Sequence, residues 1–331
     1  MQMGFGMTAR IEFSSEQPTL SVVIPMYNEA DGLDMLFAAL CPVLDSLQTP
    51  YEIVCVDDGS RDDTLVQLQA RTKTVKGLVV AELSRNFGKE AALSAGLDLA
   101  RGMAVIPFDA DLQDPPAMIP KLIEKWREGF DVVLAKRIDR SAEGPLKRLT
   151  AWAFYRTHNL LAELPIPDNV GDFRLLDRKV VDVILQLPER RRFMKGLFAW
   201  VGFKTATLDF ERETRAAGDT KWNYWKLWNL ALEGITSFSS LPLRLWFYVG
   251  VIVALISFVY AAFIIVLALV HGIDVPGYAS LLVVVLFLGG LQLLSLGLLG
   301  EYIGRIYTET KGRPLYILRS VQRGPNRGED A

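Results

Sequence analysis

Short apolar runs alternate with helical patterns along the first part of the chain. The apolar runs occupy residues 20–27, 51–58, 77–84, 103–110 and 131–137. Segments with helical patterns lie between them, at 29–47, 64–73, 88–100 and 118–129. Strands that alternate with helices predict a mostly parallel sheet with helices on its faces, so we expect an α/β fold.

Each predicted strand ends in a polar cluster. The clusters read PMYNE, DDGS, SRNFGKE, DADLQD and KR. In an open parallel sheet, ligands bind outside the carboxyl ends of the strands, which lie at one edge. The five clusters therefore predict a single binding site at that edge.

The pattern is less regular between residues 144 and 208. We interpret it as a helical run at 147–164, a loop at 165–177 and a second helix before the sequence RRRFMKGLFAWVGF. The pattern alone predicts no strand pairing for this region.

Two later stretches carry no charged residue, Leu245–Val270 and Tyr278–Gly300. Each is long enough to cross a hydrocarbon core of about 30 Å. The alternative is a helical hairpin buried in a soluble core, where uncharged runs of this length are uncommon. We therefore expect two transmembrane helices within residues 245–303.

Basic residues flank these stretches on one side only. Arg244 precedes the first stretch, and Arg305, Lys311, Arg313 and Arg319 lie at the end of the second or beyond it, whereas the connection HGIDVPGYA has no Lys or Arg. Because cytoplasmic segments are enriched in basic residues, we expect both termini and the α/β domain in the cytoplasm. The first residues show no secretory signal. The expected location is the inner (plasma) membrane, with more than one crossing.

Aromatic residues precede the first stretch. Trp222, Trp225 and Trp228 recur at spacing three beside lysines, a pattern typical of a helix in the headgroup layer. The alternative is a helix packed on the soluble domain. The expected organisation is an extension at 1–19, a cytoplasmic domain at 20–220, interfacial helices at 221–244, the transmembrane region at 245–303 and a cytoplasmic tail at 304–331, whose last residues, RGPNRGEDA, look disordered.

The composition of the chain argues against some kinds of partner and metal site. The net charge of -2 gives no sign of a nucleic-acid partner. Cys41 and Cys55 fit a reducing compartment, and with His158 and His271 as the only histidines no Cys/His zinc cluster is expected. Any metal is therefore expected to be a hard ion bound through oxygen.

Asp109 and Asp111 follow the fourth apolar run. On an extended segment, residues two apart point the same way, so both carboxylates can face one ion. Mg²⁺ is usually held by one or two carboxylates together with substrate phosphates. The alternative is a pair of solvated loop acids, but the position at a strand end favours a site for Mg²⁺ or Mn²⁺ that holds a diphosphate.

Asp57 and Asp58 follow the second apolar run, before Gly59 and Ser60. One of these acids can bind the base or the ribose of a nucleotide. The alternative is that both acids cap the following helix.

Residues after the first and third runs can complete a nucleotide site. Pro25, Tyr27 and Glu29 offer a stacking surface and an acceptor for the nucleoside. Arg85 and Lys89 can compensate phosphate charge, although Lys89 alone could equally be a solvated helix residue.

These residues belong to a longer series of motifs: VVIPMYNE, VDDGS, SRNFGKEAALSAGLDLA, DADLQDPP, GDFRLLDRKVV, RAAGDTKW, GITSFSSLPLR and GLLGEYIGRIYTETKGRPLYI. The series resembles the family-2 glycosyltransferases that load sugars onto polyprenyl phosphates, in particular the bacterial two-span branch that includes bactoprenol glucosyltransferases. Dolichyl-phosphate mannose synthases are more distant relatives. The resemblance covers residues 20 to about 320 and implies a nucleotide-sugar-binding domain of the GT-A type.

The resemblance implies roles for the donor side of the site. Pro25, Tyr27, Glu29 and Asp57 would bind the nucleoside. Asp58 and Lys89 are expected in the same donor site from their positions at the strand ends. Asp109, Asp111 and Gln113 would surround the metal and the diphosphate.

It also implies roles near the transferred group. Arg137 matches an arginine that meets a phosphate, although Ala135 and Lys136 replace the common Gly-Ser before it. Asp172 matches an acid near the acceptor, and Arg174 lies beside it in the sequence. Two further bases, Arg215 and Lys221, match bases of a loop near the phosphates.

The family resemblance implies an inverting enzyme that transfers a sugar from a nucleotide sugar to polyprenyl (undecaprenyl) phosphate. UDP-glucose is the expected donor, and GDP-mannose, UDP-N-acetylglucosamine and a modified UDP-arabinose stay open. The metal would stabilise the leaving diphosphate. Because a phosphate monoester with a second pKa of about 6 is largely dianionic at neutral pH, Asp172 could orient the acceptor or act as a base.

Three other functions are alternatives to this glycosyl transfer, and each would differ from it in a specific feature. A processive polysaccharide synthase would show a Q-x-x-R-W motif and more spans. A membrane-anchored nucleotide-sugar sensor would bind the donor without turnover. A transporter would place ionisable residues within the spans, and these spans have none. Homo-oligomer formation stays open.

Overall fold

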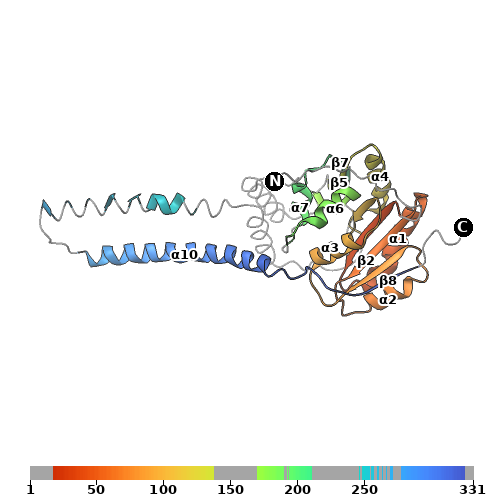
Figure 1. Cartoon of the computed structure of the whole chain (residues 1–331), viewed down its shortest axis with the longest axis horizontal. Coiled ribbons are helices and arrows are strands. Elements are labelled where there is room, and N and C mark those ends of the chain that lie inside the picture. The colour runs from red at the N-terminus through yellow and green to blue at the C-terminus, as the bar shows by residue number, and fades with distance from the viewer. Residues whose placement is uncertain are drawn as a thin grey trace, which may run out of the picture.

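The computed structural model describes residues 18–137, 170–189, 192, 194–210, 246, 248–253, scattered positions between 255 and 270, and 277–324. An α/β domain and a long helix that extends away from it make up most of these residues (Figure 1). The boundaries expected near residues 220, 244 and 303 stay predictions.

The centre of the domain is one eight-stranded sheet with the order β7-β5-β6-β4-β1-β2-β3-β8. Its strands are β1 (Leu20–Met26), β2 (Tyr51–Asp57), β3 (Leu78–Leu83), β4 (Ala104–Pro107), β5 (Val132–Arg137), β6 (Val170–Asp177), β7 (Thr205–Phe210) and β8 (Leu318–Arg323). The first five coincide with the apolar runs of the sequence. The expected α/β fold with a mostly parallel sheet is confirmed.

Strand directions place the predicted site. β1 is parallel to β2 and β4, and β2 is parallel to β3. β6 is antiparallel to both β4 and β5, so β5 runs in the same direction as β4. The carboxyl ends of β1 to β5 therefore share one edge, called the carboxyl edge below, and the amino end of β6 lies at that same edge.

Helices cover both faces of the sheet. The helices are α1 (Leu33–Ser46), α2 (Thr64–Arg71), α3 (Lys89–Leu99), α4 (Ile119–Arg127), α6 (Arg178–Gln186) and α7 (Met194–Trp200), with short 3-10 turns at Ala30–Gly32 and Pro116–Met118. One core packs α1, α2 and α4 against the sheet, and the other packs α3, α6 and α7. Alternate residues of β1 enter the two cores, with Val22 and Ile24 in the first and Val23 in the second.

The loop expected at residues 165–177 is wrong over its second part, because Val170–Asp177 forms β6. Gly171, Asp172 and Arg174 interrupt the apolar pattern and concealed the strand. The strand is buried on both faces, with Phe173 in the first core and Leu176 in the second. The ring of Phe173 packs edge to face against Phe108 at 5.6 Å and Phe210 at 6.3 Å between centroids. The helix expected after it is confirmed as α6, whereas the helical run at 147–164 lies outside the described residues.

The second uncharged stretch forms a helix from its expected first residue. It is α10 (Tyr278–Thr310), whose Leu281, Phe287 and Leu293 side chains are exposed. Among the described residues, α10 is the one helix long and apolar enough to cross a membrane, with Phe287–Thr310 as the candidate span. Of the first stretch, residues 246 and 248–253 are helical, and the expected interfacial helices at 221–244 lie outside the described residues.

A strand also occurs in the tail, where the sequence predicted none. After α10 the chain returns to the domain, and Leu318–Arg323 pairs antiparallel with β3 as β8 (Figure 1). The tail from residue 304 is therefore not a separate segment: its second part completes the sheet.

Candidate active site

The loops after β1 and β2 are bonded together at the carboxyl edge. The amide of Asn28 donates to Ser60 Oγ at 3.0 Å, and the amide of Arg61 donates to Asn28 Oδ1 at 2.8 Å. The amide of Glu29 donates to Thr64 Oγ1 at 2.9 Å. These bonds fix the backbone that carries Tyr27 and Glu29 against the loop that carries Asp57.

Asp57 ends β2 and has a side chain that is almost fully buried, with 1% of the residue exposed. Its Oδ2 accepts a bond from the amide of Ser60 at 3.1 Å. Its Oδ1 is buried and has no hydrogen-bond partner among the residues that the structure describes. Burial raises the pKa of Asp57, against the bonds from Ser60, and the nearby charge of Glu82 raises it further. Asp57 therefore offers a desolvated acceptor to a ligand N–H or O–H group.

Asp58 has a structural role, because it accepts hydrogen bonds from the backbone. Its two carboxylate oxygens accept bonds from the amides of Phe87, at 2.7 Å, and Gly88, at 2.9 Å. Burial raises its pKa, against these two bonds. The carboxylate thus holds the loop between β3 and α3, and neither Asp57 nor Asp58 bonds to α2 in the described structure, so the capping alternative is not observed. We therefore favour Asp57 over Asp58 as the nucleoside contact.

Gly59 allows the loop after β2 and the loop after β3 to approach closely. Its φ is +67°, and a Cβ atom at this position would lie 2.7 Å from the backbone of Arg85 and of Asn86. Glycine is required here for both its conformation and its lack of a side chain.

Three elements converge on the ammonium group of Lys89. Lys89 begins α3, and its Nζ lies 2.7 Å from Asp109 Oδ1, after β4, and 2.9 Å from Asp172 Oδ2, at the start of β6. Burial opposes the charged form of Lys89, but the carboxylates of Asp172 and Asp109 outweigh it and raise its pKa. The acid expected near the metal and the acid expected near the acceptor are therefore joined by one cation.

Asp109 and Asp111 suit a metal that is completed by its substrate. The chain turns sharply after Asp111, because Leu112 has a φ of +53°, and the amide of Gln113 donates to Asp111 Oδ1 at 3.2 Å. Within the described residues, no group of three or more His, Cys, Asp or Glu side chains could hold a metal. Two carboxylates at a place that already accepts the ammonium of Lys89 fit a hard divalent ion that takes its other ligands from a diphosphate.

Arg174 lies beneath this cluster, not on its surface. Only 4% of the residue is exposed, its guanidinium stacks over the Phe198 ring at 4.3 Å, and Nη2 donates to the carbonyl of Gly171 at 2.6 Å. Burial lowers its pKa to about 10, against the charges of Asp172 and Glu90. These contacts support the backbone of β6 next to Asp172, and the expected contact of Arg174 with the acceptor stays a prediction.

Comparison with known proteins identifies the family. The family model described as glycosyl transferase family 2 matches residues 21–185, and the model of the GtrB C-terminal hairpin matches residues 241–306. A Synechocystis glycosyltransferase described as uncharacterised is 58% identical over 91% of this chain and 95% of its own length. The chain belongs to the family-2 glycosyltransferases.

One further relative and one solved structure carry more specific descriptions. The bactoprenol glucosyl transferase of Shigella phage SfII is 52% identical to this glycosyltransferase, over 92% of this chain and 99% of its own length. The glucosyl-3-phosphoglycerate synthase of Mycobacterium tuberculosis, solved with Mn²⁺, UDP-glucose and phosphoglyceric acid, is 21% identical, with a TM-score of 0.43 over 66% of this chain and 77% of that one.

The remaining predicted residues of this glycosyltransferase have the following positions. Pro25 lies in β1 near the carboxyl edge, Tyr27 follows it with 38% of its surface exposed, and Arg137 ends β5 at the same edge. Arg215 and Lys221 lie outside the described residues. The structure therefore brings together residues from the ends of β1, β2, β4 and β5 and from the start of β6, as expected of one site.

A charged pair that the sequence did not predict lies beside Asp57. Glu82 of β3 is the register partner of Asp57, and its Oε1 lies 2.7 Å from Arg319 Nη1 of β8. The stretch LRSVQR around Arg319 has no strict alternation of apolar and polar residues, so its pattern did not reveal the strand.

Proposed function

We propose that this family-2 glycosyltransferase is a membrane-bound inverting enzyme that transfers glucose from UDP-glucose to polyprenyl (undecaprenyl) phosphate. The observation that carries the proposal is the meeting of Asp109 and Asp172 at Lys89. It supports the proposal because one of these acids is expected on the donor side and the other on the acceptor side. The close relatives described as bactoprenol glucosyl transferases support the choice of sugar and lipid.

The nucleoside is assigned to Asp57 and the loop after β1. The unpaired Oδ1 of Asp57 suits the imide N–H of uracil, and the exposed ring of Tyr27, near Pro25 and Glu29, suits stacking against the base. Guanine also presents N–H donors. Asp57 alone therefore does not separate UDP-glucose from GDP-mannose.

The diphosphate is assigned to Asp109 and Asp111 together with Mg²⁺ or Mn²⁺, which would neutralise charge on the leaving group. The carboxylates of this chain would hold the ion, and Gln113 would lie beside it. Arg137, Arg215 and Lys221 would contribute fixed positive charge to the phosphates.

The acceptor is assigned to the side of Asp172. A phosphate oxygen of the lipid attacks the anomeric carbon as the bond from that carbon to the diphosphate oxygen breaks, and UDP leaves with the electron pair. The dianionic acceptor has no proton to lose at the attacking oxygen. The carboxylate of Asp172 repels that dianion, so Asp172 would act by holding Lys89, the cation that would orient the acceptor phosphate, with Arg174 as a second nearby positive charge.

The lipid acceptor accounts for a membrane anchor. A polyprenyl phosphate stays in the headgroup layer, so the site must lie close to that layer. We place α10 and the stretch Leu245–Val270 across the inner membrane, with the catalytic domain and both termini in the cytoplasm. Trp222, Trp225 and Trp228 would lie at the headgroups.

A donor panel tests the proposal. The purified full-length protein is incubated with undecaprenyl phosphate, Mg²⁺ or Mn²⁺ and each of UDP-glucose, GDP-mannose, UDP-N-acetylglucosamine and a UDP-arabinose, and the lipid-linked sugar is measured. We expect glucosyl lipid from UDP-glucose, lost in chelator and in Asp111→Asn. Donor binding without release of nucleoside diphosphate would favour the sensor instead.

A further inference from the structure

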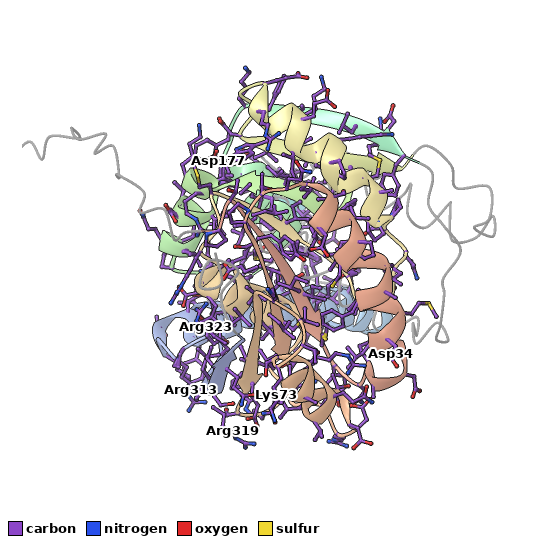
Figure 2. The ribbon with its side chains drawn as sticks, turned by 90° about the vertical axis from the view of Figure 1, so that its right-hand side faces the viewer. Asp34, Lys73, Asp177, Arg313, Arg319 and Arg323 are labelled. Atoms are coloured by element: carbon purple, nitrogen blue, oxygen red, sulfur yellow. The ribbon has the colours of Figure 1, made fainter. Side chains whose placement is uncertain are left out.

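β8 connects the membrane helix to the outer edge of the catalytic sheet. It follows α10 by seven residues, Lys311 to Ile317, and pairs along β3 from Val79↔Arg323 to Leu83↔Leu318. Figure 2 labels Arg319 and Arg323 at this edge of the domain. The two arginines lie at opposite ends of β8, and only Arg319 lies toward the carboxyl edge.

Arg319 contacts the strand end beside Asp57. Its Nη1 donates to Glu82 Oε1 at 2.7 Å, and its Nη2 donates to the carbonyl of Ser84 at 3.2 Å. Ser320 Oγ donates to the other oxygen of Glu82 at 3.0 Å. All three contacts lie at the end of β3, where Glu82 is the register partner of Asp57.

Glu82 and Asp57 lie on the same face of the sheet, because directly paired residues of parallel strands point the same way. Two carboxylates so placed repel each other, and the side chain of Glu82 is only 12% exposed, so water screens it poorly. Arg319 supplies the opposite charge at this point.

β8 also fixes the loop that leads to Lys89. The amide of Ser84 donates to the carbonyl of Ile317 at 2.8 Å. The following residues, Arg85 to Gly88, contact Gly59 and donate to Asp58. The loop between β3 and α3 is thus held at its first end by Ile317 of the tail and at its second end by Asp58.

We propose that Arg319 is a positioning residue for the donor nucleotide: it neutralises Glu82, so that the carboxylate of Asp57 is left to receive the nucleoside. This inference rests on the proposed function, because it takes Asp57 as the nucleoside contact. It adds to that function a part for the tail beyond α10, which would join the membrane helix to the donor site.

Arg323 provides a matched control. It also joins β8 to the sheet through a glutamate, with its Nη1 3.6 Å from Glu52 Oε2. Its register partner is Val79, near the amino end of β3 and away from the carboxyl edge. A role of β8 that is only structural would make the two arginines equivalent.

The test measures the affinity of the full-length protein in detergent for UDP with Mg²⁺, by titration calorimetry. We expect Arg319→Ala to raise the Kd for UDP about fivefold, the size that a partly exposed ion pair supports. Arg323→Ala should change it by less than about twofold, and kcat at saturating donor should change little in either variant. Arg319→Lys, which keeps the charge, should bind UDP like the wild type.

Removal of Glu82 as well separates charge from structure. In Glu82→Gln with Arg319→Ala, no carboxylate is left to face Asp57, so the Kd should return to near the wild-type value. An unchanged Kd in Arg319→Ala, an equal loss in Arg323→Ala, or no recovery in the double variant would each overturn the inference while leaving the proposed function intact. A wild-type protein that does not bind UDP would instead contradict the proposed function, and the inference with it.

Discussion

Lys89 is the residue at which the charges of the site meet. Its ammonium lies within 2.9 Å of both Asp109 and Asp172. If Asp109 holds the proposed divalent ion, the ammonium would compete with that ion in the absence of a donor, while it holds Asp172 in place. Removal of the ammonium should therefore have opposite effects on metal binding and on turnover.

For Lys89→Met we predict tighter Mn²⁺ binding to the donor-free protein, measured by electron paramagnetic resonance, together with a fall in kcat of about 10²-fold. The fall is the size expected when a reacting group is misplaced by about 1 Å. Lys89→Arg serves as the control that keeps the charge. Looser Mn²⁺ binding in Lys89→Met would show that the lysine supports the metal site instead of competing with the metal.

Asp57 should make donor binding depend on pH. Burial raises its pKa, and the ionised carboxylate accepts a nucleoside N–H more strongly than the protonated acid does. UDP affinity should therefore rise as the pH increases through this raised pKa, and Asp57→Asn should remove both the affinity and the pH dependence. Titrations at a series of pH values check this, and the same profile in Asp57→Asn would contradict it.

The raised pKa of Asp57 makes stability fall as the pH rises, whereas donor affinity should rise. Because the folded state binds the Asp57 proton more tightly than the unfolded state, this residue lowers the free energy of unfolding as the pH rises from the ordinary aspartate pKa through the raised one. Asp57 thus favours binding over stability at neutral pH, which is typical of a functional group.

At the scale of elements, the sequence predicted the strands and helices that a local apolar pattern specifies. β1 to β5 and the helices between them follow from local patterns, and with them the shared edge that holds Asp57, Asp109 and Arg137. β6 was missed because Gly171 and two charged residues break its pattern, although tertiary packing around Phe173 buries it. β8 was missed because its partner β3 lies more than 230 residues away in the sequence, as in the pair Arg319–Glu82.

The close contacts of Gly59 could not be predicted either, because the sequence identifies a glycine in a turn but not the backbone that packs against it. We predict that Gly59→Ala destabilises the protein by about 1–3 kcal/mol or more, because the new methyl group would meet the backbone of Arg85 and Asn86 at 2.7 Å and φ is +67°. Gly32→Ala is the control: Gly32 has a φ of −93° and nothing within 4 Å of a Cβ. Chemical denaturation measures both, and equal stabilities would refute the prediction.

At the scale of the whole molecule, the sheet constrains the topology of the membrane region. β7 and β8 belong to the same sheet, so the chain between Phe210 and Leu318 must leave the domain and return to the same side of the membrane. The number of crossings between them is therefore even. If α10 crosses, a second segment must also cross, and Leu245–Val270 is the other uncharged stretch of sufficient length in that interval.

An even number of crossings agrees with the distribution of basic residues but follows from the sheet alone. We predict that a reporter fused after Ala331 faces the cytoplasm, and that one inserted at Asp274, between the two stretches, faces the opposite side. Reporter activity and accessibility to an impermeant thiol reagent at an introduced cysteine provide two independent measurements. A cytoplasmic signal from Asp274 would mean that neither stretch crosses, because a single crossing would separate β8 from the sheet that it completes.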